Sequence, residues 1–132
     1  MMRFFPFMAF AVLAYGVVVA VMGIPLERVL FSIGLPSGAS FAPTTGETLL
    51  AVAILVLFFE IMNAASARSS SILNHGLSLL VFVGCGLAFL LLPAFGTGTF
   101  LVITVMSLID VVAGYSISIL TARRDLTVGP QD

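Results

Sequence analysis

The chain has 132 residues, of which 61% are hydrophobic and only 8% are charged, whereas soluble domains carry roughly 25% charged residues. A soluble fold could not cover so much apolar surface with polar side chains, so we predict an integral membrane protein of one domain, residues 1–132. The net charge of −1 provides no broad basic face, which argues against nucleic acid as a partner. The single cysteine, Cys85, excludes an intramolecular disulfide.

Four apolar segments have the length of about 20 residues that a helix needs to cross a bilayer. They cover approximately residues 4–23, 48–66, 71–93 and 99–121. The first is longer than the apolar region of a signal peptide, so we expect it to be retained rather than cleaved. The expected fold class is all-α: a polytopic membrane protein with four transmembrane helices in an antiparallel bundle.

The connection over residues 24–46 is the longest between these segments. Pro25 suits the first turn of a helix and Gly34 its end, and the apolar residues between them fall on one helical face. This pattern predicts a short helix lying in the membrane interface, as part of a connector rather than a gate over a substrate path. Thr44 and Glu47 have the spacing of a capping box, which predicts the start of the second helix.

The distribution of the arginines predicts the topology. With four spans, Arg3, Arg68, Arg123 and Arg124 share one side of the membrane, and only Arg28 lies on the other. By the positive-inside rule both termini are expected in the cytoplasm, for a multi-pass protein of the cell inner membrane.

Two ionisable residues flank the turn between the second and third segments. Glu60 and His75 are nearly equidistant in sequence from Arg68, so in a helical hairpin they would lie at equal depth and pair, with Asn63 close by. Such a pair would be either a proton relay or ion site, or a buried hydrogen-bonded clamp. We favour the clamp, because polar groups near a helix end cost less than groups at the midplane.

Asp110 lies near the midpoint of the fourth segment, where a carboxyl costs about 2.5–3.5 kcal/mol on insertion scales and should face protein. Counting inward from the helix ends makes Tyr15 its best hydrogen-bond partner by depth, and Ser107 lies one turn before it on the same face. We weigh function and structure equally for Asp110. Beside it runs a stripe of small residues, for which we favour helix packing over a water-lined path: Thr104, Ser107, Gly114, Ser118 and Thr121.

Four short segments carry a resemblance to known proteins. FFEI at 58–61, SSS with NH at 69–75, LIDV at 108–111 and TARRD at 121–125 resemble a group of small uncharacterised bacterial four-helix inner-membrane proteins, over about residues 58–126. The resemblance implies the fold but no activity. Small multidrug-resistance transporters are similar in size only, because their essential glutamate lies in the first helix, whereas residues 4–23 contain no acid.

The chain contains no Gly-rich phosphate loop, paired-histidine motif or nucleophile elbow. We therefore expect no enzyme, no cofactor, no metal site and no catalytic residues. The favoured function is an accessory, scaffold or assembly subunit of a larger inner-membrane complex, whose partners are the lipid bilayer and a membrane protein or a second copy. The alternative is a small oligomeric proton-coupled transporter or channel that uses Asp110 and a Glu60–His75 pair.

Overall fold

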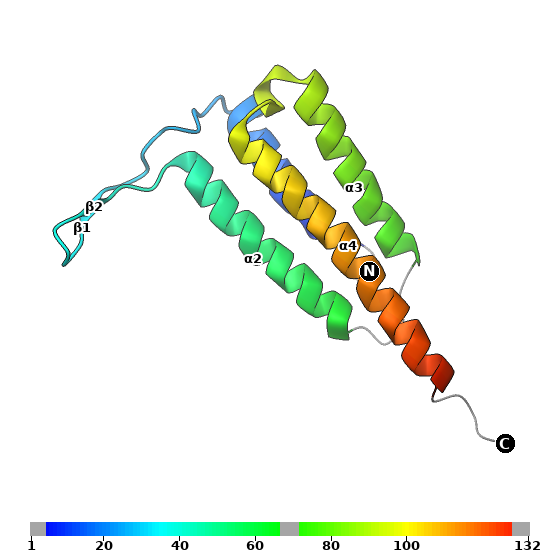
Figure 1. The fold of residues 1–132 in the computed structure, drawn as a ribbon. Helices are drawn as coiled ribbons and strands as arrows, with labels where there is room; N and C mark the ends of the chain where they lie inside the picture. Colours follow the sequence, from blue (N-terminus) through cyan, green and yellow to red (C-terminus); the bar gives the residue numbers. More distant parts are fainter. Residues whose placement is uncertain (1–4, 67–71, 128–132) are drawn as a thin grey trace.

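The computed structural model describes residues 5–66 and 72–127 (Figure 1). Four α-helices make up most of this part: α1 (Met8–Tyr15), α2 (Thr45–Ser66), α3 (Ile72–Leu91) and α4 (Gly98–Thr127). The π-helix η2 (Gly16–Val21) continues α1, and the short 3₁₀-helix η3 (Pro93–Phe95) precedes α4. The two-residue strands β1 (Ile33–Gly34) and β2 (Ser40–Phe41) lie between η2 and α2. The all-α class that the sequence predicts is confirmed.

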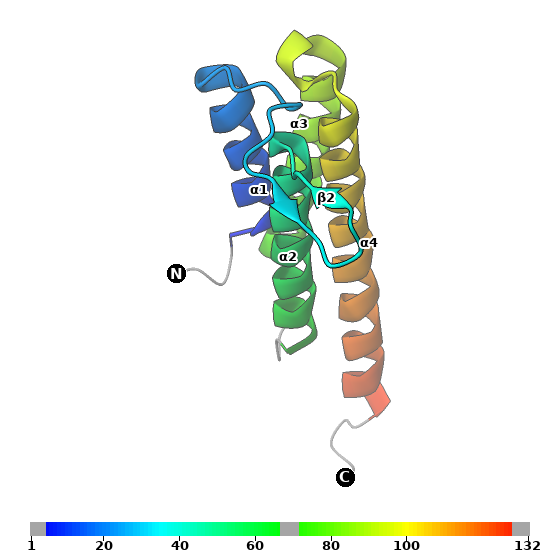
Figure 2. The ribbon, with the colours of Figure 1, turned by 90° about the vertical axis from the view of Figure 1, so that its left-hand side faces the viewer.

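The long helix α4 is the centre of the bundle. It lies between α2 and α3, and α1 packs against all three of these helices (Figures 1 and 2). Successive helices run in opposite directions, so α1 begins and α4 ends toward the same end of the bundle. The largest fully buried side chains come mainly from α1 and α4: Tyr15, Phe100, Met8 and Ile103. The core therefore lies where these two helices meet.

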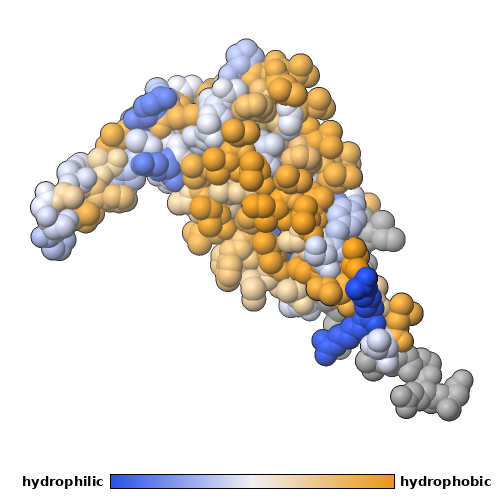
Figure 3. Space-filling view, in the orientation of Figure 1, coloured by the Kyte–Doolittle hydropathy of each residue, from blue (hydrophilic) through white to orange (hydrophobic). Residues whose placement is uncertain are grey.

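Three helices, α2, α3 and α4, are long and apolar enough to cross a membrane. The outer faces of the helices expose many large apolar side chains, including Phe59, Leu80 and Val105. Figure 3 shows this apolar surface as a broad band along the bundle, with hydrophilic residues gathered at the C-terminal end of α4 and near the start of α2. Such an apolar band bounded by polar ends is typical of helices that face lipid.

The first helix is shorter than the segment 4–23 that the sequence predicts. Proline has no N–H to donate and suits the start of a helix, and the helical turns begin with bonds from Ala9 N to the Pro6 carbonyl (3.1 Å) and from Phe10 N to the Phe7 carbonyl (2.9 Å). At the other end Gly23 adopts a φ of 67°, which stops the helix. The helical stretch Met8–Val21 is shorter than the three long helices.

The interfacial helix predicted after Pro25 is wrong, because this segment forms a β-hairpin arm, residues 29–44. Ile33 pairs with Phe41 and Gly34 with Ser40 in antiparallel register. Gly38 N bonds to the Leu35 carbonyl at 2.9 Å, and Gly38 has a φ of 87°. From Phe31 to Pro36 large apolar residues alternate with small or polar ones or proline, which suits strands better than a helix. A Pro-Ser-Gly turn then folds it back on itself.

The capping box predicted for the second helix is confirmed. Thr44 N donates to Glu47 Oε2 at 2.9 Å, and Glu47 N donates to Thr44 Oγ1 at 3.3 Å. This reciprocal pair provides acceptors for the backbone N–H groups of Thr44 and Glu47 at the helix start, and α2 begins at Thr45. At the other end of the chain, α4 continues past the predicted boundary of residue 121 to Thr127.

Candidate functional site

The N-terminus of α1 is capped by a carboxyl group from another helix. Glu60 of α2 accepts hydrogen bonds from Phe7 N (3.1 Å, to Oε1) and from Met8 N (2.8 Å, to Oε2). Its side chain is buried, with 5% exposed. The first N–H groups of a helix have no partner within the helix. Glu60 therefore supplies both the missing acceptors and a negative charge at the positive end of the helix dipole.

Asp110 of α4 completes this polar cluster. Its carboxyl group is in hydrogen-bonding contact with the carboxyl group of Glu60 and with the hydroxyl of Ser78 on α3. Asp110 and Ser78 are 6% and 5% exposed. Four helices thus contribute to one buried cluster: the backbone of α1 and the side chains of Glu60, Ser78 and Asp110. We call this the carboxyl cluster.

Two carboxyl groups can share a hydrogen bond only when one of them is protonated, because two carboxylates are both acceptors. In a buried site of low dielectric constant, two ionised carboxylates in contact also repel each other strongly. A hydrogen bond between Glu60 and Asp110 therefore requires a proton on one of the two carboxyl groups. Chemically the carboxyl cluster can hold helices together and can take up or release that proton.

The predicted hydrogen bond between Tyr15 and Asp110 is wrong. The Tyr15 hydroxyl donates to the Ala94 carbonyl (2.9 Å) and lies 2.7 Å from Thr97 Oγ1, at the opposite end of the bundle. Its ring packs against Phe95 and Phe100, with centroids 5.4 and 4.8 Å apart. The depth count fails because the helix starts at Met8, level with Glu60, which moves Tyr15 roughly 10 Å further along.

We expect Tyr15→Phe to lower the free energy of unfolding by about 1–2 kcal/mol, because Ala94 and Thr97 lose a buried partner. Thr97 Oγ1 also accepts from Phe100 N at 3.1 Å at the start of α4, so the loss loosens this end of the bundle. Reversible unfolding in bicelles measures the change. Tyr115→Phe is the matched control: Tyr115 is 43% exposed, and we expect a change below about 0.5 kcal/mol. Equal effects of the two substitutions would contradict the assignment.

The predicted pair of Glu60 and His75 is also wrong. His75 hydrogen-bonds to Ser118 of α4 and stacks on Tyr115, with ring centroids 5.4 Å apart. The prediction assumed that α2 and α3 pack side by side as a hairpin, but α4 lies between them. Gly114 makes room for the imidazole, because a Cβ at that position would lie 2.9 Å from His75 Nδ1.

The remaining predicted residues have separate positions. Ser107 is buried and donates to the Thr104 carbonyl at 2.7 Å, so this part of the small-residue stripe packs inside the chain. The Asn63 side chain is exposed and lies outside the carboxyl cluster. Arg68 lies outside the described residues.

Sequence reasoning missed the backbone amides of Phe7 and Met8 and the hydroxyl of Ser78. The signal for the amides was Pro6, since a helix that starts just after a proline inside an apolar segment must find acceptors for its first N–H groups. Ser78 gave no signal of its own, because a serine on an apolar helix usually bonds to its own backbone.

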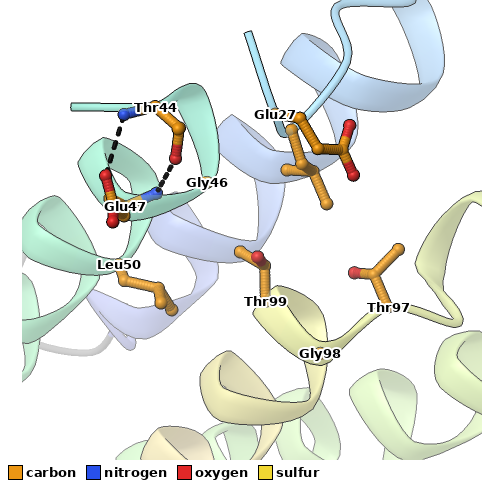
Figure 4. A pocket seen from close by; sticks show the side chains of 9 residues that line it. Glu27, Thr44, Gly46, Glu47, Leu50, Thr97, Gly98 and Thr99 are labelled. Carbon is orange, nitrogen blue, oxygen red and sulfur yellow. Dashed lines mark hydrogen bonds between the residues drawn. The ribbon is translucent and has the colours of Figure 1, made fainter. Parts of the chain in front are cut away.

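A hollow of about 380 Å³ lies at the end of the bundle away from the carboxyl cluster, where α2 and α4 begin. Figure 4 shows Glu27, Glu47 and several threonines around it. The Glu47 carboxyl is occupied in the capping box with Thr44, so we assign no ligand to this hollow. Among the described residues, no group of three or more His, Cys, Asp or Glu side chains is placed to hold a metal ion.

No family model, curated protein or solved structure shows a significant match to the chain. The resemblance to small bacterial four-helix membrane proteins therefore stays a prediction, and the functional argument depends on the geometry alone.

Proposed function

We propose that this chain is a four-span protein of the bacterial inner membrane, with both ends in the cytoplasm, that serves as an accessory or scaffold subunit of a larger membrane assembly. In this proposal α1, extended by the residues before it, is the fourth span. The polar groups of the carboxyl cluster act as a clamp that joins four helices. The chain is not an enzyme.

The outer face of α3 supports the proposal that the chain associates with a partner. A Cβ at Gly84 would meet no described atom within 4 Å, whereas His75 fills the space beside Gly114 on α4. Leu80 and Leu87 lie one turn before and one turn after Gly84 on the same face, and they are 66% and 53% exposed. In lipid, small residues between large ones let a second helix approach closely. The interior polar groups are used within the chain, and this outward face is left for association.

We expect the protein, extracted with its native lipids into nanodiscs, to have a mass larger than that of one chain. Gly84→Leu should reduce it to the single-chain mass without loss of helicity, because the added side chain blocks close approach. Gly86→Leu is the control: it lies on α3, also with open space around it, but two residues further along, which places it about 200° around the helix from Gly84. Native mass spectrometry measures the masses. A wild-type protein found only as single chains would contradict the proposal.

A second candidate function is proton-coupled transport. The observation that favours it is the contact between Glu60 and Asp110, which requires a bound proton. Intramembrane carboxyl pairs of this kind occur in proton pathways. We rank it second because the Tyr15, Phe95 and Phe100 rings pack tightly together at the far end of the bundle.

A further inference from the structure

The β-hairpin arm has one apolar and one polar face. Side chains alternate along a strand, so Phe31 and Ile33 share a face, and Phe41 joins them because it pairs with Ile33. The Phe31 and Phe41 rings are 6.1 Å apart. On the opposite face the hydroxyls of Ser32 and Ser40 lie 3.0 Å apart.

The apolar face of the arm is uncovered within the described chain. Phe31, Ile33 and Phe41 are 52%, 50% and 46% exposed. The arm leaves the bundle at the end opposite to Arg123 and Arg124 and projects sideways, across the direction of the helices (Figures 1 and 2). If the helices cross a membrane, this direction takes the arm along the membrane surface. A two-stranded hairpin is only marginally stable in water, so a covering layer would stabilise it.

The base of the arm combines a cation with an apolar hollow. Arg28 is one of the residues that line a hollow of about 240 Å³, together with apolar side chains of η2, the arm and α2, including Val18, Leu30 and Leu49. Arg28 is exposed. Its backbone carbonyl accepts a hydrogen bond from Thr45 N at 2.9 Å, which holds the Arg28 backbone against the start of α2. Among the described residues its side chain has no ion pair.

We propose that the arm and this hollow form a phospholipid site at the membrane surface. Arg28 binds the phosphate, an acyl chain lies in the hollow beside Leu30 and Leu49, and the apolar face of the arm rests in the boundary between headgroups and acyl chains. A guanidinium matches a phosphate in charge and geometry. Anionic lipids are preferred because they lack a headgroup cation that competes with Arg28. The proposal depends on the membrane insertion stated under Proposed function.

The first experiment locates the arm in vesicles of phosphatidylcholine and phosphatidylglycerol. In a Cys85→Ala background, a fluorophore is attached at Ile33→Cys or at Val105→Cys, which replaces an exposed residue about two turns into α4. We expect the label at 33 to be quenched by spin labels near the headgroups and the label at 105 by spin labels deep in the acyl chains. Failure of the label at 105 would overturn the membrane proposal itself. Quenching at 105 without quenching at 33 would overturn only the phospholipid site.

The second experiment tests Arg28 through the lipid preference at the arm. Spin-labelled phosphatidylglycerol should quench the label at 33 with about a fivefold advantage over spin-labelled phosphatidylcholine. Arg28→Gln should remove this advantage, Arg28→Lys should keep most of it, and Arg124→Gln, at the other end of the bundle, should leave it unchanged. Leu30→Ser should weaken quenching by both lipids, because it makes the hollow polar.

Two results would assign the arm to another occupant. Loss of the phosphatidylglycerol preference on addition of inorganic phosphate at constant ionic strength would show a site for free phosphate and overturn the lipid. A label at 33 that is shielded from aqueous iodide, but quenched by neither lipid, would show that protein covers the arm, such as a second copy, and would also overturn it.

Discussion

Glu60→Ala is expected to lower the free energy of unfolding by about 3–5 kcal/mol, the largest effect of any single substitution considered. Phe7 N and Met8 N would each lose an acceptor, and hydrogen bonds to a charged group contribute about 1.5–3 kcal/mol each. Because Glu60 is 5% exposed, its removal leaves these N–H groups in a largely buried position, where an unmade hydrogen bond is costly. Unfolding in bicelles measures the stability, and hydrogen exchange at Phe7, Met8 and the next turn of α1 should accelerate together.

Glu47→Ala is the matched control for this substitution. Glu47 is also a glutamate of α2 that caps a helix start, but it is exposed and bonds to Thr44, three residues before it in the sequence. We expect a loss of about 1 kcal/mol and no change of exchange in α1. If Glu60→Ala cost no more than Glu47→Ala, α1 would not depend on Glu60 and the clamp would be wrong.

Asp110→Ala is expected to cost about 2–3 kcal/mol, because Glu60 and Ser78 each lose their contact with the Asp110 carboxyl group. In the Glu60→Ala background the same substitution should cost about 1–3 kcal/mol less, because residues in one hydrogen-bonded network are coupled. A double-mutant cycle of unfolding free energies measures the coupling. Additive losses would show that the two carboxyl groups act independently and would contradict the shared proton.

Asp110→Asn separates the two candidate functions. Its side-chain amide can donate to the Glu60 carboxylate without a titrating proton, so a clamp should keep its stability within about 1 kcal/mol of the wild type. In proteoliposomes containing a pH-sensitive dye, the scaffold proposal expects no proton flux above that of empty vesicles for either protein. Proton flux in the wild type that disappears in Asp110→Asn would favour the transporter instead.

The carboxyl cluster would contain the same residues whether it acts as a clamp or as a proton site. The same contact between Glu60 and Asp110 that joins α2 to α4 also requires a proton. If the proton were released, the repulsion between the two carboxylates would act on the helix start that Glu60 caps. The cluster would therefore couple protonation to the packing of α1, whichever function proves correct.

Several features followed from the sequence because they depend on neighbouring residues. The apolar composition predicted long helices, and the Thr44–Glu47 spacing predicted the start of α2, since a capping box is complete within four residues. The high cost of a carboxyl inside a bundle predicted that Asp110 faces protein, and it is 6% exposed.

The identity of the partners was decided by the tertiary structure. Depth counting assumed that each helix begins at the end of its apolar segment and packs on its neighbour in sequence. Instead Pro6 delays the start of α1, and α4 separates α2 from α3. The first change moves Tyr15 from Asp110 to Thr97, and the second moves His75 from Glu60 to Ser118. Hydropathy determines which residues leave water. The packing order of four helices of similar hydropathy depends instead on the fit between their side chains, which the hydropathy pattern does not specify.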